Sequence, residues 1–302
     1  MLNSLLIFMV LTATACLPEQ DRKVDDCPRE ATRFAQVRQK AAAKDPVAET
    51  ALASCYDLGL HVHPDGREWI RLLTEAAGQG YAHAQYEVGR IYLYGRGVPA
   101  DYPRALRWET RAAEQGDSRA QRDLAFMYER GFGVPADPAK AAEWNKKAAA
   151  QGNAEAQVHL GHALDEGMGV PANPAEARKW YAKAARQNQA QAQLQLARKF
   201  AEAPDCANAI HWYEQASGHG ETTAMYELGR LYMSGRCKSN PSLALKWYTI
   251  GARFGSVESR AAAETLAKSL SPGASKQAQD AAGRWIKIHS DAQPDEDSED
   301  GR

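Results

Sequence analysis

Five stretches of this 302-residue sequence are copies of one another, and they decide its fold. The first, from Tyr81, reads Y-A-H-A-Q-Y-E-V-G-R-I-Y-L-Y-G-R-G-V-P-A-D. The second, from Asp117, reads D-S-R-A-Q-R-D-L-A-F-M-Y-E-R-G-F-G-V-P-A-D, and the third, from Asn153, reads N-A-E-A-Q-V-H-L-G-H-A-L-D-E-G-M-G-V-P-A-N. Two more begin at Gln189 and Glu221, so the period is 36 residues, shortened to 32 and then 35. Such a period predicts stacked helix hairpins.

Each copy contains the pattern of two helices. In the first helix, small or apolar residues recur at i, i+4 and i+8, as in Ala84, Val88 and Tyr92, and form one face. A glycine then ends this helix, as a left-handed cap requires, at Gly95, Gly131, Gly167 and Gly235. The second helix begins at an Asp or Asn residue that is followed closely by a proline. That helix carries a tryptophan, which we expect to be a buried wedge between repeats: Trp108, Trp144, Trp180, Trp212 and Trp247.

One position of the first helix holds only Gly or Ala. Glycine inside a helix costs about 1 kcal/mol relative to alanine, so its recurrence needs a packing reason. We expect another helix to cross closely over this position, which is occupied by Gly89, Ala125, Gly161, Ala197 and Gly229.

The pattern A-x-x-x-L-G-x-x-Y-x-x-G-x-G-V-x-x-D…A-x-x-W…A-A-x-x-G resembles the Sel-one-like repeat family, a branch of the tetratricopeptide-like helical solenoids, over roughly residues 45–270. The copy from Gln189 departs from it by lacking the G-V-P-A loop, and the copy from Asp45 has Leu72 in place of the tryptophan. The resemblance implies an all-α, right-handed α/α solenoid of about seven helix-hairpin repeats, with a concave face that binds other proteins.

The sequence predicts five regions. They are a lipoprotein-type signal peptide (1–15), a lipid-anchored tether (16–27), an N-terminal capping helix (28–44), the repeats (45–290) and an acidic disordered tail (291–302). The predicted repeats are 45–80, 81–116, 117–152, 153–188, 189–220, 221–255 and a C-terminal cap at 256–290 whose second helix includes Trp285.

The first residues are typical of an export signal. Leu5 to Leu11 is apolar but too short to span a bilayer. The following A-T-A-C, ending at Cys16, resembles a bacterial lipoprotein signal, although Ala13 stands where such signals usually carry Leu. The resemblance implies lipidation of Cys16, and Leu17 after it favours the outer membrane of a Gram-negative bacterium, facing the periplasm. An ordinary cleaved signal and a chain that is not exported are the alternatives.

Charge and composition narrow the class of partner. With 44% hydrophobic and 25% charged residues, the chain is typical of a folded globular protein. Its net charge is −1, and the last twelve residues hold six acids and one base, so the rest carries +4. There is no global basic field for nucleic acid. We therefore expect no nucleic-acid partner, and contact with a membrane only through the lipid anchor.

Apart from Cys16, the chain has four cysteines, which allow three pairings. An even number in an exported chain predicts two disulfides. Cys206 and Cys237 fall in the same inter-helix loop of successive repeats, and such loops lie side by side in a solenoid, which favours this pair. Cys27 and Cys55 then pair by elimination, although their distances from the turn near Asp45 differ by about 12 Å in helical rise.

Other first-helix positions vary between copies. Their spacing places them on one face of the helix, away from the face of small and apolar residues described above. In solenoids of this family the first helices line the concave groove. Tyr, Phe and Arg are enriched at binding hot spots, and guanidinium groups favour carboxylates, so we expect a protein or peptide partner with an acidic segment. The candidate partner-binding residues are Tyr86, Arg90, Arg122, Phe126, His162, Arg198, Tyr226 and Arg230.

We expect no catalytic residue, cofactor or metal. The sequence contains no H-E-x-x-H or G-x-S-x-G motif, and His61, His63 and Asp65 alternate in a proline-containing loop, which is a weak metal pattern. Some cysteine-rich relatives have been described as β-lactamases, but S-x-x-K and K-T-G are missing here. A β-lactamase-like or peptidoglycan-directed enzyme is the alternative to our leading interpretation, a monomeric exported scaffold. Its narrower version is a periplasmic immunity protein that neutralises a secreted effector.

Overall fold

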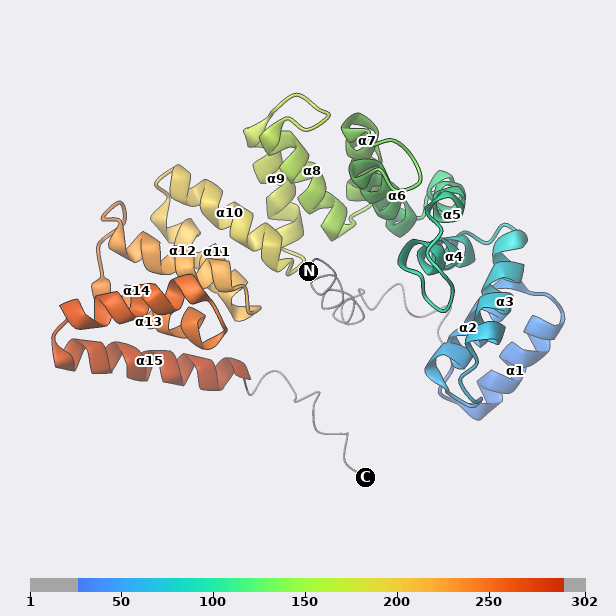
Figure 1. Ribbon diagram of the computed structural model, residues 1–302, viewed down its shortest axis with the longest axis horizontal. Helices are drawn as coiled ribbons and strands as arrows, with labels where there is room; N and C mark the ends of the chain where they lie inside the picture. The colour runs from blue at the N-terminus through green and yellow to red at the C-terminus, as the bar shows by residue number, and fades with distance from the viewer. Residues whose placement is uncertain (1–26, 291–302) are drawn as a thin grey trace. The chain divides into compact units, whose positions relative to one another are not determined.

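The computed structural model describes residues 27–290, and every regular element in that range is an α-helix. The predicted signal peptide with Cys16, most of the tether and the acidic tail lie outside the described residues. The chain forms two units, one up to Gln151 and the other from Gly152. Each unit is a series of helix hairpins (Figure 1), which confirms the predicted all-α solenoid of about seven repeats.

The described part of the first unit, residues 27–151, contains seven helices, whose bounds are α1 (Ala31–Ala42), α2 (Pro46–Leu58), α3 (Gly66–Gly78), α4 (Ala82–Tyr94), α5 (Tyr102–Glu114), α6 (Ser118–Arg130) and α7 (Pro138–Ala150). Helices α2 and α3, α4 and α5, and α6 and α7 pack as hairpins. Helix α3 also packs against α4, and α5 packs against α6. Neighbouring repeats therefore share a continuous core.

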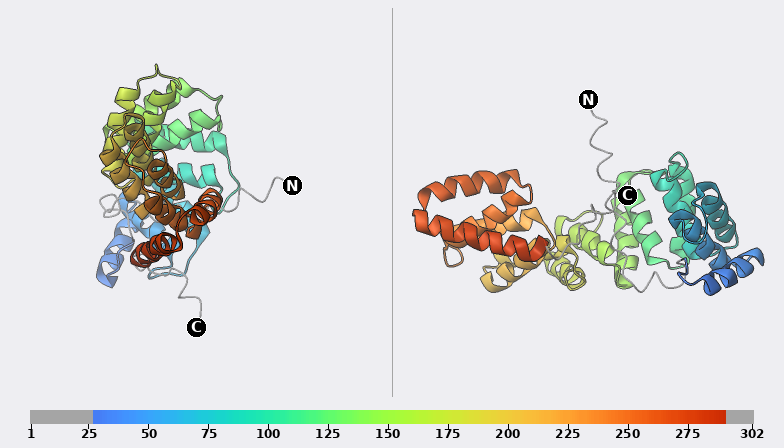
Figure 2. Two further views of the ribbon diagram at one scale, coloured as in Figure 1. Left: turned by 90° about the vertical axis from the view of Figure 1, so that its left-hand side faces the viewer. Right: turned by 90° about the horizontal axis from the view of Figure 1, so that it is seen from below.

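The second unit continues with α8 (Ala154–Glu166), α9 (Pro174–Ala185), α10 (Ala190–Glu202), α11 (Cys206–Gly218), α12 (Thr222–Met233), α13 (Pro241–Arg253), α14 (Val257–Ser269) and α15 (Pro272–Ser290). The last two helices depart from the hairpin pattern, because α14 and α15 both pack against α13 (Figure 2). Trp285 of α15 meets Trp247 of α13 edge to face, with ring centroids 5.5 Å apart. The closing helices therefore cover the apolar end of the stack.

Short sequence signals set the ends of the helices. The Asp137 side chain, directly before Pro138, accepts a hydrogen bond from the backbone amide of Lys140 in the first turn of α7, as an N-cap before a first-turn proline should. Gly95, Gly131 and Gly167 end their first helices in the left-handed conformation, as predicted. Gly235 is also left-handed, but it lies one residue after the C-cap, since α12 ends at Met233 and Ser234 is its C-cap.

A side chain from the paired second helix explains the Gly/Ala position. A Cβ on Gly161 would lie 2.7 Å from the Tyr181 ring, and one on Gly229 would lie even closer to the Tyr248 ring. These distances are too short for a real Cβ, so the side chain packs directly on the first-helix backbone. The close crossing expected from the sequence is present.

Buried glutamines link successive repeats. Gln121 donates to the carbonyl of Ala113 in the preceding helix at 3.0 Å and accepts a hydrogen bond from Gln151 at 2.8 Å. Gln85 makes the equivalent pair of bonds, to Ala77 and from Gln115. Each glutamine thus adds a hydrogen bond to a carbonyl near the end of the preceding helix and joins two repeats.

The tryptophans lie between repeats, as predicted, but most are not fully buried. Trp247 is buried, whereas Trp108, Trp144, Trp180 and Trp212 are partly exposed. In three repeats a cation three residues later covers the indole ring, as Lys147 covers Trp144 at 3.7 Å, and Arg111 and Lys183 do the same. The fully enclosed position is instead the residue after the tryptophan, because that one faces the first helix of its own hairpin.

Both expected disulfides are present. Cys206 and Cys237 join successive loops of the second unit, with Cα atoms 5.7 Å apart. Cys27 and Cys55 are joined with Cα atoms 4.8 Å apart. The apparent mismatch of the second pair disappears because α1 begins only at Ala31. Residues 27–30 fold back against the loop after α2, where His61 bonds to the carbonyl of Pro28.

Candidate functional site

The variable first-helix positions differ in their exposure to solvent. At one position Tyr86, Val158 and Leu194 are buried, while Arg122 and Tyr226 are only partly buried. One turn later, every residue is partly or fully exposed: Arg90, Phe126, His162, Arg198 and Arg230. These five therefore form the accessible part of the predicted binding face, which we call the first-helix face.

Tyr86 belongs to the core rather than to the accessible surface. Its side chain is 1% exposed and packs in the cluster of Ala112, Ala120 and Leu124. Two guanidinium groups cover its ring, from Arg119 at 4.7 Å and Arg90 at 5.6 Å. Because these cations shield the ring from solvent, Tyr86 supports the face without being available to a partner, which corrects its expected exposure.

Arg90 is held in place by aromatic rings on its own helix. Its guanidinium lies 5.6 Å from the Tyr86 ring and 5.5 Å from the Tyr94 ring, which is within cation–π range. Arg90 thus keeps its charge in a fixed and only partly exposed position.

Arg122 is already engaged by an acid. It forms an ion pair of 2.6 Å with Asp123, whose side chain is fully buried. The nearby Glu109 is also fully buried, and burial, followed by the charge of Asp123, raises its pKa well above the ordinary value. The charge of Arg122 opposes this rise. Arg122 therefore balances buried carboxyl groups rather than reaching out to a ligand.

Phe126 lies in an aromatic group near the end of α6. It meets Phe132 edge to face at 5.6 Å, and Phe132 stacks on Tyr102 at 4.5 Å. Arg130 covers the Phe126 ring at 5.7 Å. Tyr102 is exposed and the two phenylalanines are partly exposed, so this group offers the first unit's face an aromatic surface.

The second unit has a pocket of about 410 Å³ on this face. Arg230 and Met233 of α12 line it, with Ala201 of α10 on one side and Tyr213 and Tyr248 of the second helices below. Burial raises the pKa of both tyrosines to about 12, so their hydroxyls remain protonated and can donate hydrogen bonds. This pocket combines apolar surface with a few polar groups, as ligand sites do.

Glu227 links two of the predicted arginines at this pocket. Arg230 approaches its carboxylate at 3.3 Å and Arg198 at 3.9 Å. Arg230 stays largely exposed, and Arg236 also lines the pocket. The pocket lining therefore contains two arginines, Arg230 and Arg236, and one carboxylate, Glu227, which leaves a net positive charge.

The other predicted residues of the second unit lie beside this pocket or apart from it. Tyr226 packs on Tyr248 with ring centroids 5.7 Å apart and lies under Arg230. His162 is exposed on α8 and does not line the pocket. The sequence reasoning missed Tyr213 and Tyr248, although one signal was available. The residue after the tryptophan is Tyr in three copies, at Tyr181, Tyr213 and Tyr248.

The histidine motif near residue 61 serves the fold. His61 stacks on Phe34 at 4.8 Å, and Asp65 caps α3 by accepting from Arg67 and Glu68. Within residues 27–290, no three His, Cys, Asp or Glu side chains are grouped so that they could hold a metal ion. In the same range, no helix is both long enough and apolar enough to span a membrane.

Many solved structures resemble this chain, and two of them serve as examples. A protective antigen present in uropathogenic Escherichia coli strains, with an SLR fold, is 30% identical with a TM-score of 0.72, over 86% of this chain and 57% of its own. This chain therefore spans just over half the length of that protein. A Sel1 repeat protein from Oxalobacter formigenes is 28% identical with a TM-score of 0.64, over 73% of this chain and 90% of its own.

An immunity protein from Pseudomonas aeruginosa is 19% identical with a TM-score of 0.39, over 87% of each chain, a level that carries no functional argument. No curated protein matches the chain. The sequence matches the Sel1 repeat at residues 46–81, 82–117, 118–153, 154–189, 190–221 and 222–255. The chain therefore belongs to the Sel1 repeat family, whose members are protein–protein interaction scaffolds that are generally not catalytic.

Proposed function

We propose that this protein binds a protein partner on its first-helix face, with the pocket at Arg230 and Met233 as the main contact in the second unit. The observation that carries this proposal is the pocket's lining, in which an exposed arginine and methionine stand above two tyrosines that can donate hydrogen bonds. Arg and Tyr are the residues that dominate measured binding hot spots.

An acidic segment of the partner fits this pocket. Arg230 and Arg236 together outnumber Glu227, and a partner carboxylate can bind a guanidinium through two parallel hydrogen bonds. In the first unit, Arg90 offers a second cation, while Phe126, Phe132 and Tyr102 offer aromatic surface. Tyr86, which is buried, and Arg122, which pairs with Asp123, stabilise this face and do not contact the partner.

The role of the pocket at Arg230 and Met233 in partner binding can be tested by comparing two matched double variants. Arg230→Ala/Met233→Ala removes one cation and one apolar side chain from the pocket, whereas Lys268→Ala/Val257→Ala removes the same types from exposed sites on α14. Each immobilised variant is incubated with envelope extract, and captured proteins are quantified by mass spectrometry. A true partner should fall about tenfold with the pocket variant and stay within twofold with the control. Equal recovery by both would remove the pocket from the proposal.

We also propose that the chain works in the periplasm, anchored through Cys16. Two disulfides are typical of an oxidising, exported location, and the A-T-A-C stretch supports lipidation. Metabolic labelling with a fatty-acid analogue tests the anchor. Wild-type protein should be labelled and fractionate with the outer membrane, and Cys16→Ser should be unlabelled. Equal labelling of both would exclude Cys16 as the attachment site.

The immunity role is a narrower form of the same proposal, in which the partner is a toxic effector. It predicts that the captured partner is toxic when exported alone and harmless together with this chain. A harmless partner would leave a general scaffold. An enzymatic role predicts turnover of a chromogenic β-lactam such as nitrocefin, and we expect none.

A further inference from the structure

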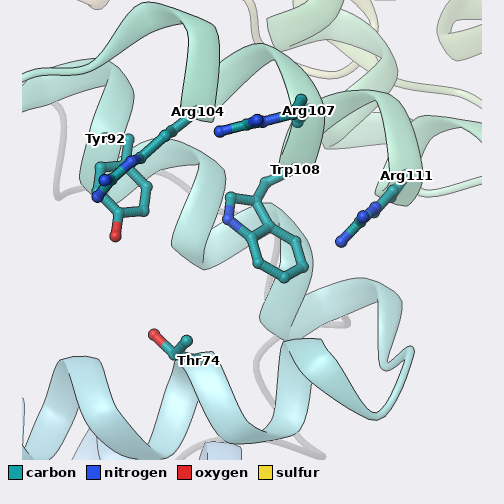
Figure 3. A pocket seen from close by; sticks show the side chains of 6 residues that line it. All are labelled: Thr74, Tyr92, Arg104, Arg107, Trp108 and Arg111. Atoms are coloured by element: carbon teal, nitrogen blue, oxygen red, sulfur yellow. The ribbon is translucent and has the colours of Figure 1, made fainter.

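A second pocket, of about 320 Å³, lies in the first unit and shares no residue with the first-helix face defined above. Tyr92 of α4 and Trp108 of α5 form one wall, and Thr74 of α3 faces them (Figure 3). Three arginines of α5 complete the lining, namely Arg104, Arg107 and Arg111. We call this site, which lies between two successive repeats, the arginine pocket.

The arginine pocket has an excess of positive charge. Among the described residues, no acidic side chain lines it. Arg104 is partly neutralised by Asp101, at 3.1 Å. Arg111 lies over the Trp108 ring at 4.8 Å, and Arg107 is exposed. Within residues 27–290, neither Arg107 nor Arg111 forms an ion pair with a carboxylate. Two guanidinium groups are therefore available to bind an anion.

The fold does not require these arginines, because the other repeats replace them. At the three equivalent positions, helices α3, α7 and α9 each carry at least one acid, namely Glu68 and Glu75, Glu143, and Glu176. Helices α11 and α13 carry no acid there, and their only lysine or arginine is Lys246. The tryptophan, by contrast, recurs in every copy except α3. The row of three arginines is therefore a property of this one repeat.

The rest of the pocket wall suits a peptide backbone. The indole nitrogen of Trp108 lies on the ring edge that faces Tyr92, and the Tyr92 hydroxyl points toward α3 (Figure 3). Both groups can donate a hydrogen bond. The Thr74 hydroxyl donates to the Ile70 carbonyl at 2.7 Å, so its oxygen keeps lone pairs that can accept one. A peptide presents carbonyl and amide groups, and it can therefore use the acceptor as well as the donors.

The two available guanidinium groups set the spacing of the acids that they can bind. Arg107 and Arg111 are four residues apart, which is a rise of about 6 Å along α5. Alternate residues of an extended chain lie on one side of it, about 6.6 Å apart. A guanidinium binds a carboxylate through two parallel hydrogen bonds. We propose that the arginine pocket binds an extended segment of a partner protein that carries acids at alternate positions.

The test uses fluorescence anisotropy at low salt, with the purified full chain and two fluorescein-labelled peptides. One peptide, G-L-E-L-E-L-G, carries its acids at alternate positions. The other, G-L-E-E-L-L-G, has the same composition, but its adjacent acids point to opposite sides of an extended chain. The first should bind about fivefold more tightly than the second, and salt should weaken its binding because the ion pairs are exposed.

Variants of the chain should locate this binding at α5. Arg107→Gln/Arg111→Gln should weaken binding of the alternating peptide about tenfold. Lys140→Gln/Lys147→Gln, which removes the same charge from α7, should change the affinity less than twofold. Thr74→Val keeps the shape of the side chain but removes the acceptor, and it should weaken binding about threefold.

Three results would overturn the proposal. Equal losses in the α5 and α7 variants would mean that the peptide responds only to overall charge. Equal affinity for the two peptides would mean that the pocket does not distinguish the spacing of the acids. Displacement of the labelled peptide by sodium phosphate at lower concentration than by unlabelled peptide would assign the pocket to phosphate groups.

A further variant separates this proposal from the function proposed above. Arg230→Ala/Met233→Ala changes the pocket on the first-helix face and leaves the arginine pocket intact. It should therefore bind the alternating peptide as tightly as wild type. A loss in this variant without a loss in Arg107→Gln/Arg111→Gln would place the acidic segment on the first-helix face, and it would contradict the assignment to α5 alone.

Discussion

Tyr248 lies directly on the backbone of α12 at Gly229, where a Cβ would come within 2.6 Å of the tyrosine ring. Glu109 covers Gly89 and Tyr181 covers Gly161 in the same way. These contacts bring the two helices of each hairpin together. In the second unit, the same Tyr248 forms the floor of the proposed binding pocket, so hairpin packing and the binding surface share one side chain.

Gly229→Ala should therefore destabilise the protein although alanine favours helix. The added methyl group would press on the Tyr248 ring, and overpacking of this kind costs about 1–3 kcal/mol. Gly283→Ala is the matched control, because a Cβ at Gly283 in α15 would meet nothing within 4 Å. That change should stabilise by about 0.5–1 kcal/mol. Urea unfolding measures both, and equal effects at the two sites would contradict the packing account.

The buried carboxyl group of Glu109 should make the free energy of unfolding depend on pH. Burial, followed by the charge of Asp123, raises its folded-state pKa above the ordinary value of 4.5. The folded chain therefore holds this proton more tightly than the unfolded chain, so the contribution is complete below about pH 4.5 and is lost as the pH rises through the folded pKa. Glu109→Gln should raise the free energy of unfolding at pH 8 by about 1–3 kcal/mol and have little effect at pH 4.

Glu114→Gln is the control for this prediction. Glu114 lies on the same helix but is exposed, so its replacement should leave the pH profile of stability unchanged. Denaturant midpoints between pH 4 and pH 8 give the comparison. The same profile for Glu109→Gln and for wild type would show that Glu109 does not hold its proton as described.

Removing a buried glutamine should loosen the junction between two repeats. Gln121→Ala would remove two hydrogen bonds, one to the Ala113 carbonyl and one from the Gln151 amide. The expected cost is about 1–3 kcal/mol. Gln191→Ala, at an exposed site on α10, should change stability by less than about 0.5 kcal/mol. Amide hydrogen exchange should localise the loss of protection to α5, α6 and α7, and uniform loss would argue against a local junction.

The disulfide between Cys206 and Cys237 should stabilise the second unit. It closes a separation of 31 residues, which corresponds to about 3–4 kcal/mol in the chain-entropy model. Cys206→Ser/Cys237→Ser should lower the midpoint of thermal unfolding under oxidising conditions. Reductant should then no longer lower this midpoint by breaking the bond between these two cysteines. A variant with an unchanged midpoint would mean that the loops are fixed by other contacts.

The repeating features could be predicted because each copy confirms the others. The helix pairs, the glycine caps and the Gly/Ala crossing all rest on positions that recur with the period. The binding face was harder to predict, because variation between copies does not separate surface from core. Tyr86 varies as a surface residue would, but Arg119 of the next repeat folds over it. That contact joins residues from different helices, and no local pattern indicates it.

The tryptophans and cysteines show two other limits of sequence reasoning. Hydrophobic size suggested that Trp108 and its equivalents are fully buried, but the neighbouring residue occupies the enclosed position. For Cys27 and Cys55, the calculation assumed two straight helices, whereas α1 begins four residues after Cys27. In both cases the repeat period was predicted correctly, but the local geometry of individual residues was not.

The most direct test of partner binding on the first-helix face uses a photo-crosslinking amino acid in intact cells. Placed at Met233, which lines the pocket and is 43% exposed, it should give one discrete adduct on illumination. Placed at Val257, which is 72% exposed on α14 and lies outside the pocket, it should give none. An adduct from Val257 without one from Met233, or no adduct from either site, would contradict the account.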